Sequence, residues 1–355
     1  MITTTRRWLK MLALPLAAVM VLGACSSDES DVATDDTGDT AASGTVNVSG
    51  SSTVAPISTR VAELWEESGT EAAVNVDGPG TGDGFVVFCE GDADVTGASR
   101  PIEADEIAAC EETGVEFIEL KIAFDGLSII TSTDNSLACL NFVDLYAIAG
   151  PESQGFADWQ DAGALAAELG SDTEFPEGSL DISGPGEESG TYDSFVELAL
   201  GDTAEARFEE GKITEDQVET TRPDYQSSKE DNIIIQGVEG SPTSFGWVGF
   251  AFAEEASETV REIPVASEVG GECIEPTTET IADGSYPLAR PLFIYVSAPA
   301  AEANQAVADY VDYYLSSEGI AAVAEVGYVD LPADLLEETR TTWTDRTIGS
   351  AEAGA

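Results

Sequence analysis

The chain has 355 residues, with 14 Lys and Arg against 68 Asp and Glu, no histidine, and a formal net charge of −54. This length is enough for two domains with cores of their own. The lack of histidine excludes histidine metal ligands, Ser-His catalytic pairs and histidine general bases, and the negative charge disfavours nucleic-acid binding. We interpret the acidity as a solvated surface, so local dipoles and one or two cations would have to bind any anion.

The first 24 residues are typical of an export signal. Three basic residues precede the apolar run Met11–Leu22, which is too short for a confident membrane span, and a lipobox pattern ends at Cys25. The pattern predicts cleavage before Cys25 and a lipid anchor on its sulfur, at the outer face of the cytoplasmic membrane. A plain secretory signal with a chance cysteine is the alternative. Residues 25–44 lack aromatics and are rich in Ser, Asp, Thr, Gly and Ala, which predicts a flexible acidic tether.

Removal of the signal makes the chain more acidic. The signal holds three of the 14 basic residues and no acid, so 11 basic and 68 acidic residues remain, a net charge of −57.

Four cysteines remain after Cys25, and an even number in an exported protein indicates two disulfides. Of the three possible connectivities we favour Cys89–Cys110, which closes a short loop, with Cys139–Cys273, which ties distant segments of one domain.

The first third of the chain alternates predicted strands, loops and helices. The predicted strands are 45–48, 73–76, 94–101 (ending in a loop) and 115–120, and the predicted helices are 57–67, 84–89 and 103–113. This alternation predicts an α/β fold with a mostly parallel sheet. Its loops would meet at the carboxyl ends of the strands, where such sheets bind ligands.

Three loops share the same chemistry. Gly50–Pro56, Gly78–Phe85 and Gly184–Phe195 each place small hydroxyl or glycine residues before a helical pattern. A helix start offers free backbone N–H groups and the positive end of the helix dipole, which suits an anion. Each loop alone could be an ordinary N-cap. Three such loops favour a converging cradle for an oxyanion.

The rest of the chain predicts a second domain and a return to the first. The apolar strand 122–131, broken at Asp125-Gly126, could cross between domains. Further predicted strands are 181–183, 245–250 and the return strand 287–296, and further predicted helices are 140–148, 162–169, 300–315 and 317–326. The last two helices are expected to pack on the first domain.

Seven motifs in order indicate a family. They are Gly50-Ser-Ser-Thr-Val, Gly80-Thr-Gly-Asp-Gly-Phe, Ala98-Ser-Arg-Pro-Ile, Gly184-Pro-Gly with Ser189-Gly-Thr-Tyr-Asp-Ser-Phe, Asp231-Asn, Gln236-Gly-Val-Glu-Gly and Tyr286-Pro-Leu-Ala-Arg-Pro-Leu-Phe-Ile-Tyr. Over about residues 45–345 the chain closely resembles the phosphate-binding lipoprotein of the bacterial ABC-type high-affinity phosphate importer. Each motif alone is weak, but the ordered set is specific.

The resemblance implies a periplasmic-binding-protein-like fold of two α/β lobes joined by hinge strands, with phosphate in the cleft. Lobe 1 would comprise residues 45–124 and 290–345, lobe 2 residues 125–289, and residues 346–355 a tail. It also implies a monomer without cofactor that delivers phosphate to a permease and its ATPase. The phosphate ligands carried over by position are Ser52, Thr53, Val54, Thr81, Gly82, Ser99, Arg100, Ser189, Gly190 and Thr191.

The chain departs from the family pattern at two charges. At the end of the loop that holds Ala98-Ser-Arg-Pro-Ile the family has an acid, where this chain has Arg100. Four residues before Ser-Gly-Thr the family has an arginine, where this chain has Pro185. We infer that Arg100 faces phosphate, because a guanidinium suits bidentate phosphate recognition; a structural salt bridge is the alternative. Phosphate differs from sulfate by a proton that needs an acceptor. Asp125 is our candidate, although it could simply pair with Arg100.

Other functions remain open at this point. The missing acid leaves room for another oxyanion such as sulfate, molybdate or a phosphonate. A phosphatase with Ser189 or Thr191 as nucleophile is disfavoured, since no histidine or evident lysine base accompanies these hydroxyls. A sensory or adhesive role without transport is a further alternative.

Overall fold

The computed structural model describes residues 44–187 and 189–351, all within one compact unit that begins at Ala41. The predicted signal, the lipidation site Cys25 and nearly all of the tether lie outside the described residues. Within them, no helix is both long and apolar enough to cross a bilayer.

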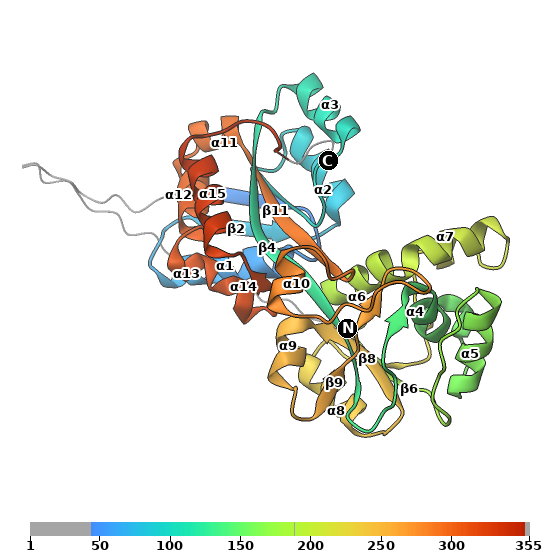
Figure 1. The fold of residues 1–355 in the computed structure, drawn as a ribbon. Helices are drawn as coiled ribbons and strands as arrows, with labels where there is room; N and C mark the ends of the chain where they lie inside the picture. Colours follow the sequence, from blue (N-terminus) through green and yellow to red (C-terminus); the bar gives the residue numbers. More distant parts are fainter. Residues whose placement is uncertain (1–43, 188, 352–355) are drawn as a thin grey trace, which may run out of the picture. The chain divides into compact units, whose positions relative to one another are not determined.

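The described residues form one sheet of ten strands and a second of two (Figure 1). The strands are β1 (Thr45–Ser49), β2 (Ala73–Asp77), β3 (Val95–Ala98), β4 (Phe117–Ser132), β5 (Leu140–Asn141), β6 (Asp181–Gly184), β7 (Gln226–Ser227), β8 (Ser244–Gly249), β9 (Val260–Glu262), β10 (Val265–Ala266), β11 (Ala289–Ser297) and β12 (Val329–Asp330). The large sheet has the order β2-β1-β3-β11-β4-β8-β6-β7, and β9 and β12 also pair with β4.

The helices alternate with these strands. They are α1 (Ala55–Glu67), α2 (Thr81–Cys89), α3 (Ala104–Thr113), α4 (Phe142–Ala149), α5 (Trp159–Glu168), α6 (Gly190–Phe195), α7 (Gly201–Glu209), α8 (Asp231–Glu239), α9 (Phe250–Glu255), α10 (Thr278–Ala282), α11 (Ala298–Ala303), α12 (Gln305–Tyr314), α13 (Ser317–Ile320), α14 (Ala322–Glu325) and α15 (Ala333–Thr344). A π-helical turn, Val196–Leu200, joins α6 to α7.

Strand β4 runs through the middle of the large sheet beside β11 (Figure 1). Its first part, to Gly126, pairs with β11, and from Leu127 to Ile130 it pairs with β8. The sequence predicted a strand over 115–120 and another over 122–131, the second one broken at Asp125-Gly126. The strand is continuous instead, because both residues keep their ladder positions opposite Arg290 and Ala289.

The expected mostly parallel sheet is correct only at its two ends. Strands β1, β2 and β3 pair in parallel, as do β6, β7 and β8. In the centre, β11 is antiparallel to both β3 and β4, and β4 is antiparallel to β8. The β-loop-α pattern of the first third does not reveal this centre, because β8 and β11 join it from later parts of the chain.

Buried apolar side chains form two large clusters. One combines β1, β3 and parts of β4 and β11 with α1, α12 and Trp343 of α15, and the other combines β6, β8 and the end of β4 with α4 and α5. The predicted helices 300–315 and 317–326 each divide into two shorter helices, and α15 was not predicted. The lobe boundaries proposed from the sequence stay a prediction.

Both predicted disulfides are confirmed. Cys89–Cys110 joins the end of α2 to α3, with Cα atoms 4.3 Å apart, and Cys139–Cys273 has Cα atoms 6.0 Å apart. Their sequence separations differ widely, 21 and 134 residues.

This difference predicts unequal effects on stability. Closing a longer loop restricts the unfolded chain more, so the Cys139→Ser/Cys273→Ser variant should lose about 5 kcal/mol of unfolding free energy and the Cys89→Ser/Cys110→Ser variant about 3 kcal/mol. Guanidinium unfolding of both variants and the parent protein measures the losses. Equal losses, or the reverse order, would contradict this expectation.

The environment of the Asp231 carboxyl predicts that the free energy of unfolding depends on pH. It is the first residue of α8, and burial raises the pKa of its carboxyl from 3.8 to about 6. The fold therefore favours the protonated form of this carboxyl. Its ionisation lowers the free energy of unfolding, and this loss is absent below pH 4 and complete above pH 6. Asp231→Asn should stabilise the protein by up to about 3 kcal/mol at pH 8 and by nothing near pH 4. Urea unfolding at both pH values tests this, with exposed Asp283→Asn as the control that should gain nothing.

Candidate functional site

The first loop follows β1 and leads into α1. Its backbone is anchored by the Ser51 N–H, which donates to the Gly97 carbonyl at 2.8 Å. Gly50 and Gly84 make close approach possible, since a Cβ on Gly84 would lie 2.3 Å from the Gly50 Cα. The start of α2 thereby reaches the first loop with no side chain between them.

The second loop and the loop that follows β3 meet through their hydroxyls. Thr81 and Ser99 lie with their Oγ atoms 3.0 Å apart, and the Ser99 N–H also donates to Thr81 Oγ1 at 3.3 Å. These two predicted ligands, far apart in the sequence, are thus side by side.

Helix α6 packs directly on the first loop. A Cβ on Gly190 would lie 2.9 Å from the Thr53 Cα, so only glycine allows this approach. The Ser52 hydroxyl donates to Asp193 Oδ2 at 2.6 Å, which ties the loop to the helix. Ser189 caps α6 by accepting from the Thr191 N–H at 3.2 Å.

These segments enclose a cavity of about 560 Å³. Six of the predicted ligands are among the residues that line it: Ser52, Thr53, Thr81, Gly82, Ser99 and Arg100. The other five, Val54, Asp125, Ser189, Gly190 and Thr191, are not. The Val54 N–H, an expected donor, already donates to the Ser51 carbonyl at 3.1 Å.

The buried cation beside the cavity is Arg290 of β11, which the sequence did not single out. Its side chain is 8% exposed and bonds to four others. Its Nη2 donates to Ser194 Oγ at 3.0 Å and Thr53 Oγ1 at 3.4 Å, its Nη1 to Glu197 Oε2 at 2.6 Å, and its Nε to Asp125 Oδ2 at 3.4 Å.

A sequence signal for this pair existed. Arg290 interrupts an apolar strand in the last of the seven motifs, and Asp125 interrupts another apolar strand. Lone opposite charges in two buried strands predict a partner for each other. The two residues face each other in the β4–β11 ladder.

Asp125 is buried and fully engaged. Besides Arg290, it accepts a hydrogen bond from the Ser194 hydroxyl at 2.6 Å. Burial raises the pKa of its carboxyl, although the Arg290 charge and the Ser194 hydroxyl oppose the rise. The alternative that Asp125 pairs with Arg100 is wrong, because its cation is Arg290.

Arg100 lies in the cavity wall but is held by acids of its own. Its Nη1 and Nη2 bind Glu106 bidentately at 2.9 and 2.8 Å, and its Nε lies 3.2 Å from Glu103. Its side chain is 30% exposed and lies over the Phe85 ring. The ion pair to α3 matches the structural alternative, and the role of Arg100 as a ligand stays a prediction.

The opposite wall of the cavity is acidic. It holds the side chains Asp193, Glu197, Asp202, Glu205 and Glu219. Burial raises the pKa of Asp193, while Ser52 and Arg290 lower it. Among the described residues no group of three or more Asp, Glu, Cys or His is arranged to hold a metal ion.

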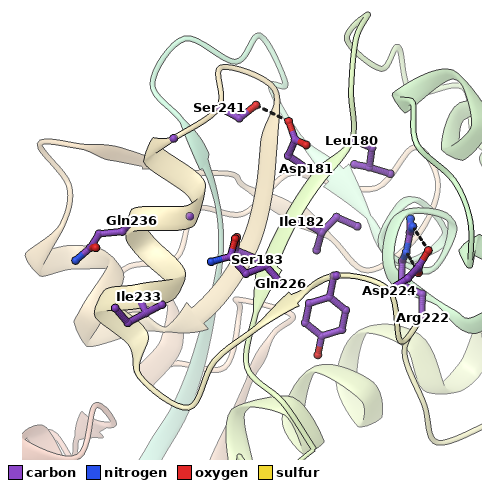
Figure 2. Close-up of a pocket in the computed structure, with 13 residues that line it drawn as sticks. Leu180, Asp181, Ile182, Ser183, Arg222, Asp224, Gln226, Ile233, Gln236 and Ser241 are labelled. Atoms are coloured by element: carbon purple, nitrogen blue, oxygen red, sulfur yellow. Dashed lines mark hydrogen bonds and ion pairs between the residues drawn. The ribbon is translucent and has the colours of Figure 1, made fainter.

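A second hollow, of about 690 Å³, lies between β6, α8 and residues 222–226 (Figure 2). Its cation, Arg222, is bound bidentately by Asp224 at 2.7 and 2.9 Å. None of the predicted ligands lines this hollow. The first cavity is therefore the one that combines the predicted loops with a buried cation.

A mixed α/β fold with small-hydroxyl loops around a buried arginine is typical of an oxyanion-binding receptor. The family model described as "PBP superfamily domain" matches residues 35–318, so the chain belongs to the PBP superfamily. The resemblance and the periplasmic-binding-protein-like fold predicted from the motifs are confirmed.

Two relatives and one crystal structure are similar to this chain over most of its length. Protein SphX of Synechococcus elongatus is 33% identical over 87% of this chain and 84% of its own length. The phosphate-binding protein PstS of Staphylococcus aureus is 28% identical, over 92% of this chain and 89% of its own. A crystal structure of a possible phosphate binding protein from Planctomyces limnophilus is 32% identical, with a TM-score of 0.75 over 86% of this chain and all of its own.

The contact between α6 and the first loop predicts the effect of a single methyl group. Gly190→Ala should push α6 away from Thr53 and break the Ser52–Asp193 hydrogen bond, weakening the binding of an oxyanion in the cavity at least about tenfold through lost alignment of the donors. Calorimetry measures the change. The control is Gly201→Ala, at a glycine that lines the cavity and where the nearest atom to a Cβ is 3.7 Å away. Equal affinities for the two variants would contradict the role of this contact.

Proposed function

We propose that this protein captures inorganic phosphate outside the cytoplasm and delivers it to an ABC permease for import. The main support is the convergence of the Thr53 and Ser194 hydroxyls on the buried Arg290, beside a cavity that Ser52, Thr81 and Ser99 also line. The relatives named for phosphate binding support the same ligand.

In this proposal the first three loops and α6 supply neutral donors, and Arg290 supplies the charge. The ligand set is that carried over from the family, Ser52, Thr53, Val54, Thr81, Gly82, Ser99, Ser189, Gly190 and Thr191, with Arg290 added. Of these, Val54, Ser189, Gly190, Thr191 and Arg290 are not among the residues that line the cavity. Hydroxyl and backbone N–H groups bind an oxyanion without placing a full charge opposite the acidic surface. Arg100, already paired with Glu106, contributes from the rim.

We assign the phosphate proton to Asp193 in place of Asp125. Asp125 Oδ2 is occupied by Ser194 and Arg290, and Asp125 does not line the cavity. Asp193 lines it and accepts from Ser52, which is itself a proposed ligand. An ionised carboxylate there accepts a hydrogen bond from the protonated oxygen of hydrogen phosphate. It repels sulfate, which has no such donor.

The remaining parts of the proposal follow the family. The chain is anchored through Cys25 at the outer face of the cytoplasmic membrane, which labelling with radioactive palmitate tests. It acts as a monomer of two lobes that close by hinge motion. No covalent chemistry occurs. Turnover of a chromogenic phosphate ester would contradict this last point.

Isothermal calorimetry with phosphate, arsenate and sulfate tests the ligand and the cation together. The parent protein should bind phosphate and arsenate tightly and sulfate at least about 100-fold more weakly. Removing the pair as Asp125→Asn/Arg290→Gln, which leaves no unpaired buried charge, should abolish measurable phosphate binding. Arg100→Ala should cost less than about tenfold, because its charge is shared with two glutamates.

Three outcomes would contradict the proposal in different ways. No phosphate binding by the parent protein would overturn the function. Equal binding of sulfate and phosphate would show that Asp193 does not act as the acceptor for the phosphate proton. Loss of phosphate binding in Arg100→Ala, with phosphate binding retained in the double variant, would show that Arg100 and not Arg290 is the binding cation. Thermal unfolding of each variant shows whether it is folded.

A further inference from the structure

Two carboxylates share Arg290, and they differ in how firmly they are held. The Asp125 side chain is 5% exposed, fixed in the β4 ladder and bonded to Ser194. The Glu197 side chain is 55% exposed and projects from the π-helical turn. Yet Glu197 makes the shorter contact, 2.6 Å from Oε2 to Nη1 against 3.4 Å from Asp125 Oδ2 to Nε. The more exposed acid therefore makes the closer contact.

Glu197 also lies on the ligand side of the arginine. It lines the same cavity as Ser52, Thr53, Thr81 and Ser99, whereas Asp125 does not. Its carboxylate, a planar oxyanion, accepts from Nη1 of Arg290, a guanidinium group of the kind that also binds phosphate.

We infer that Glu197 is an internal counter-ion that covers Arg290 in the empty site and that the incoming phosphate displaces. This inference rests on the proposed function, because it takes Arg290 as the cation that binds phosphate. It assigns Glu197 a role in selectivity: an anion enters only if it binds the site better than the tethered carboxylate does.

The energies of the two states make such an exchange feasible. A buried guanidinium with an unsatisfied N–H is costly, so a covering carboxylate stabilises the empty site. The carboxylate partner is more than half exposed and keeps part of its hydration, so its displacement costs little for a ligand that gains several charge-assisted hydrogen bonds. A small anion such as chloride gains a single contact with Arg290 and cannot compensate for the loss of Glu197.

The displaced carboxylate has a place to go. Its side chain already reaches solvent, so it regains hydration as it leaves Arg290. Asp125 remains on Arg290 throughout, so the arginine keeps one fixed negative partner whether the ligand is bound or not.

Glu197→Gln tests the inference by calorimetry with inorganic phosphate, with and without a high concentration of sodium chloride. The variant should bind phosphate roughly three- to tenfold more tightly than the parent protein, because no tethered anion competes. Chloride should weaken phosphate binding to the variant and leave the parent protein nearly unchanged.

Two matched variants separate the effect of a carboxylate that occupies Arg290 from the general effect of removing a negative charge. Glu205→Gln removes an acid from the same cavity wall, one with no ion pair to Arg290, and should bind phosphate as the parent protein does. Glu197→Asp keeps the charge but shortens the side chain by one methylene group, so it should bind phosphate nearly as tightly as Glu197→Gln.

The outcomes distinguish this inference from the proposed function. If the parent protein binds no phosphate, the proposed function fails and the inference fails with it. If the parent protein binds phosphate but Glu197→Gln binds it equally or less tightly, only the inference is overturned. An equal gain in Glu205→Gln also overturns it, because the effect would then be a general electrostatic one.

Discussion

The ion pair between Asp125 and Arg290 is the interaction on which the site depends. Removing two charges from water is expensive, and only close pairing with further hydrogen bonds offsets the cost. Here the neighbouring strands β4 and β11 supply the pairing, while Ser194 and Thr53 supply the hydrogen bonds. The pair therefore fixes a positive group beside the cavity of a protein whose mean charge repels anions, and it holds α6 and the first loop around that group.

Backbone contacts that only glycine permits bring the loops to this pair. Gly84 meets Gly50, and Gly190 meets Thr53, at separations that a Cβ would not allow. Such contacts replace side-chain packing with direct alignment of N–H groups and hydroxyls. The site is consequently built from neutral donors held at short range, and its one buried guanidinium is balanced by acids of the chain itself.

Much of this was predictable from the sequence, and the rest has identifiable reasons. The ordered motifs gave the family and fold class, and the cysteine count with loop length gave both disulfides. The loops that line the cavity were found because small hydroxyl residues before helices have a local signature. Arg290 was missed because its charge inside an apolar strand shows only that it needs a partner, and the partner, Asp125, lies 165 residues away in the sequence. The partners of Arg100 were not predicted for the converse reason: Glu103 and Glu106 lie nearby in the sequence, but their contact with Arg100 depends on how α3 begins.

The position of the ion pair along β4 has a mechanical consequence. Asp125 lies two residues before the point where β4 exchanges β11 for β8 as its partner. Because β4 keeps its backbone pairing on both sides of this junction, with β11 before it and with β8 after it, the junction lies on one continuous stretch of strand. Asp125 therefore couples Arg290 to the strand that joins both regions of the sheet, close to the place where its partner changes.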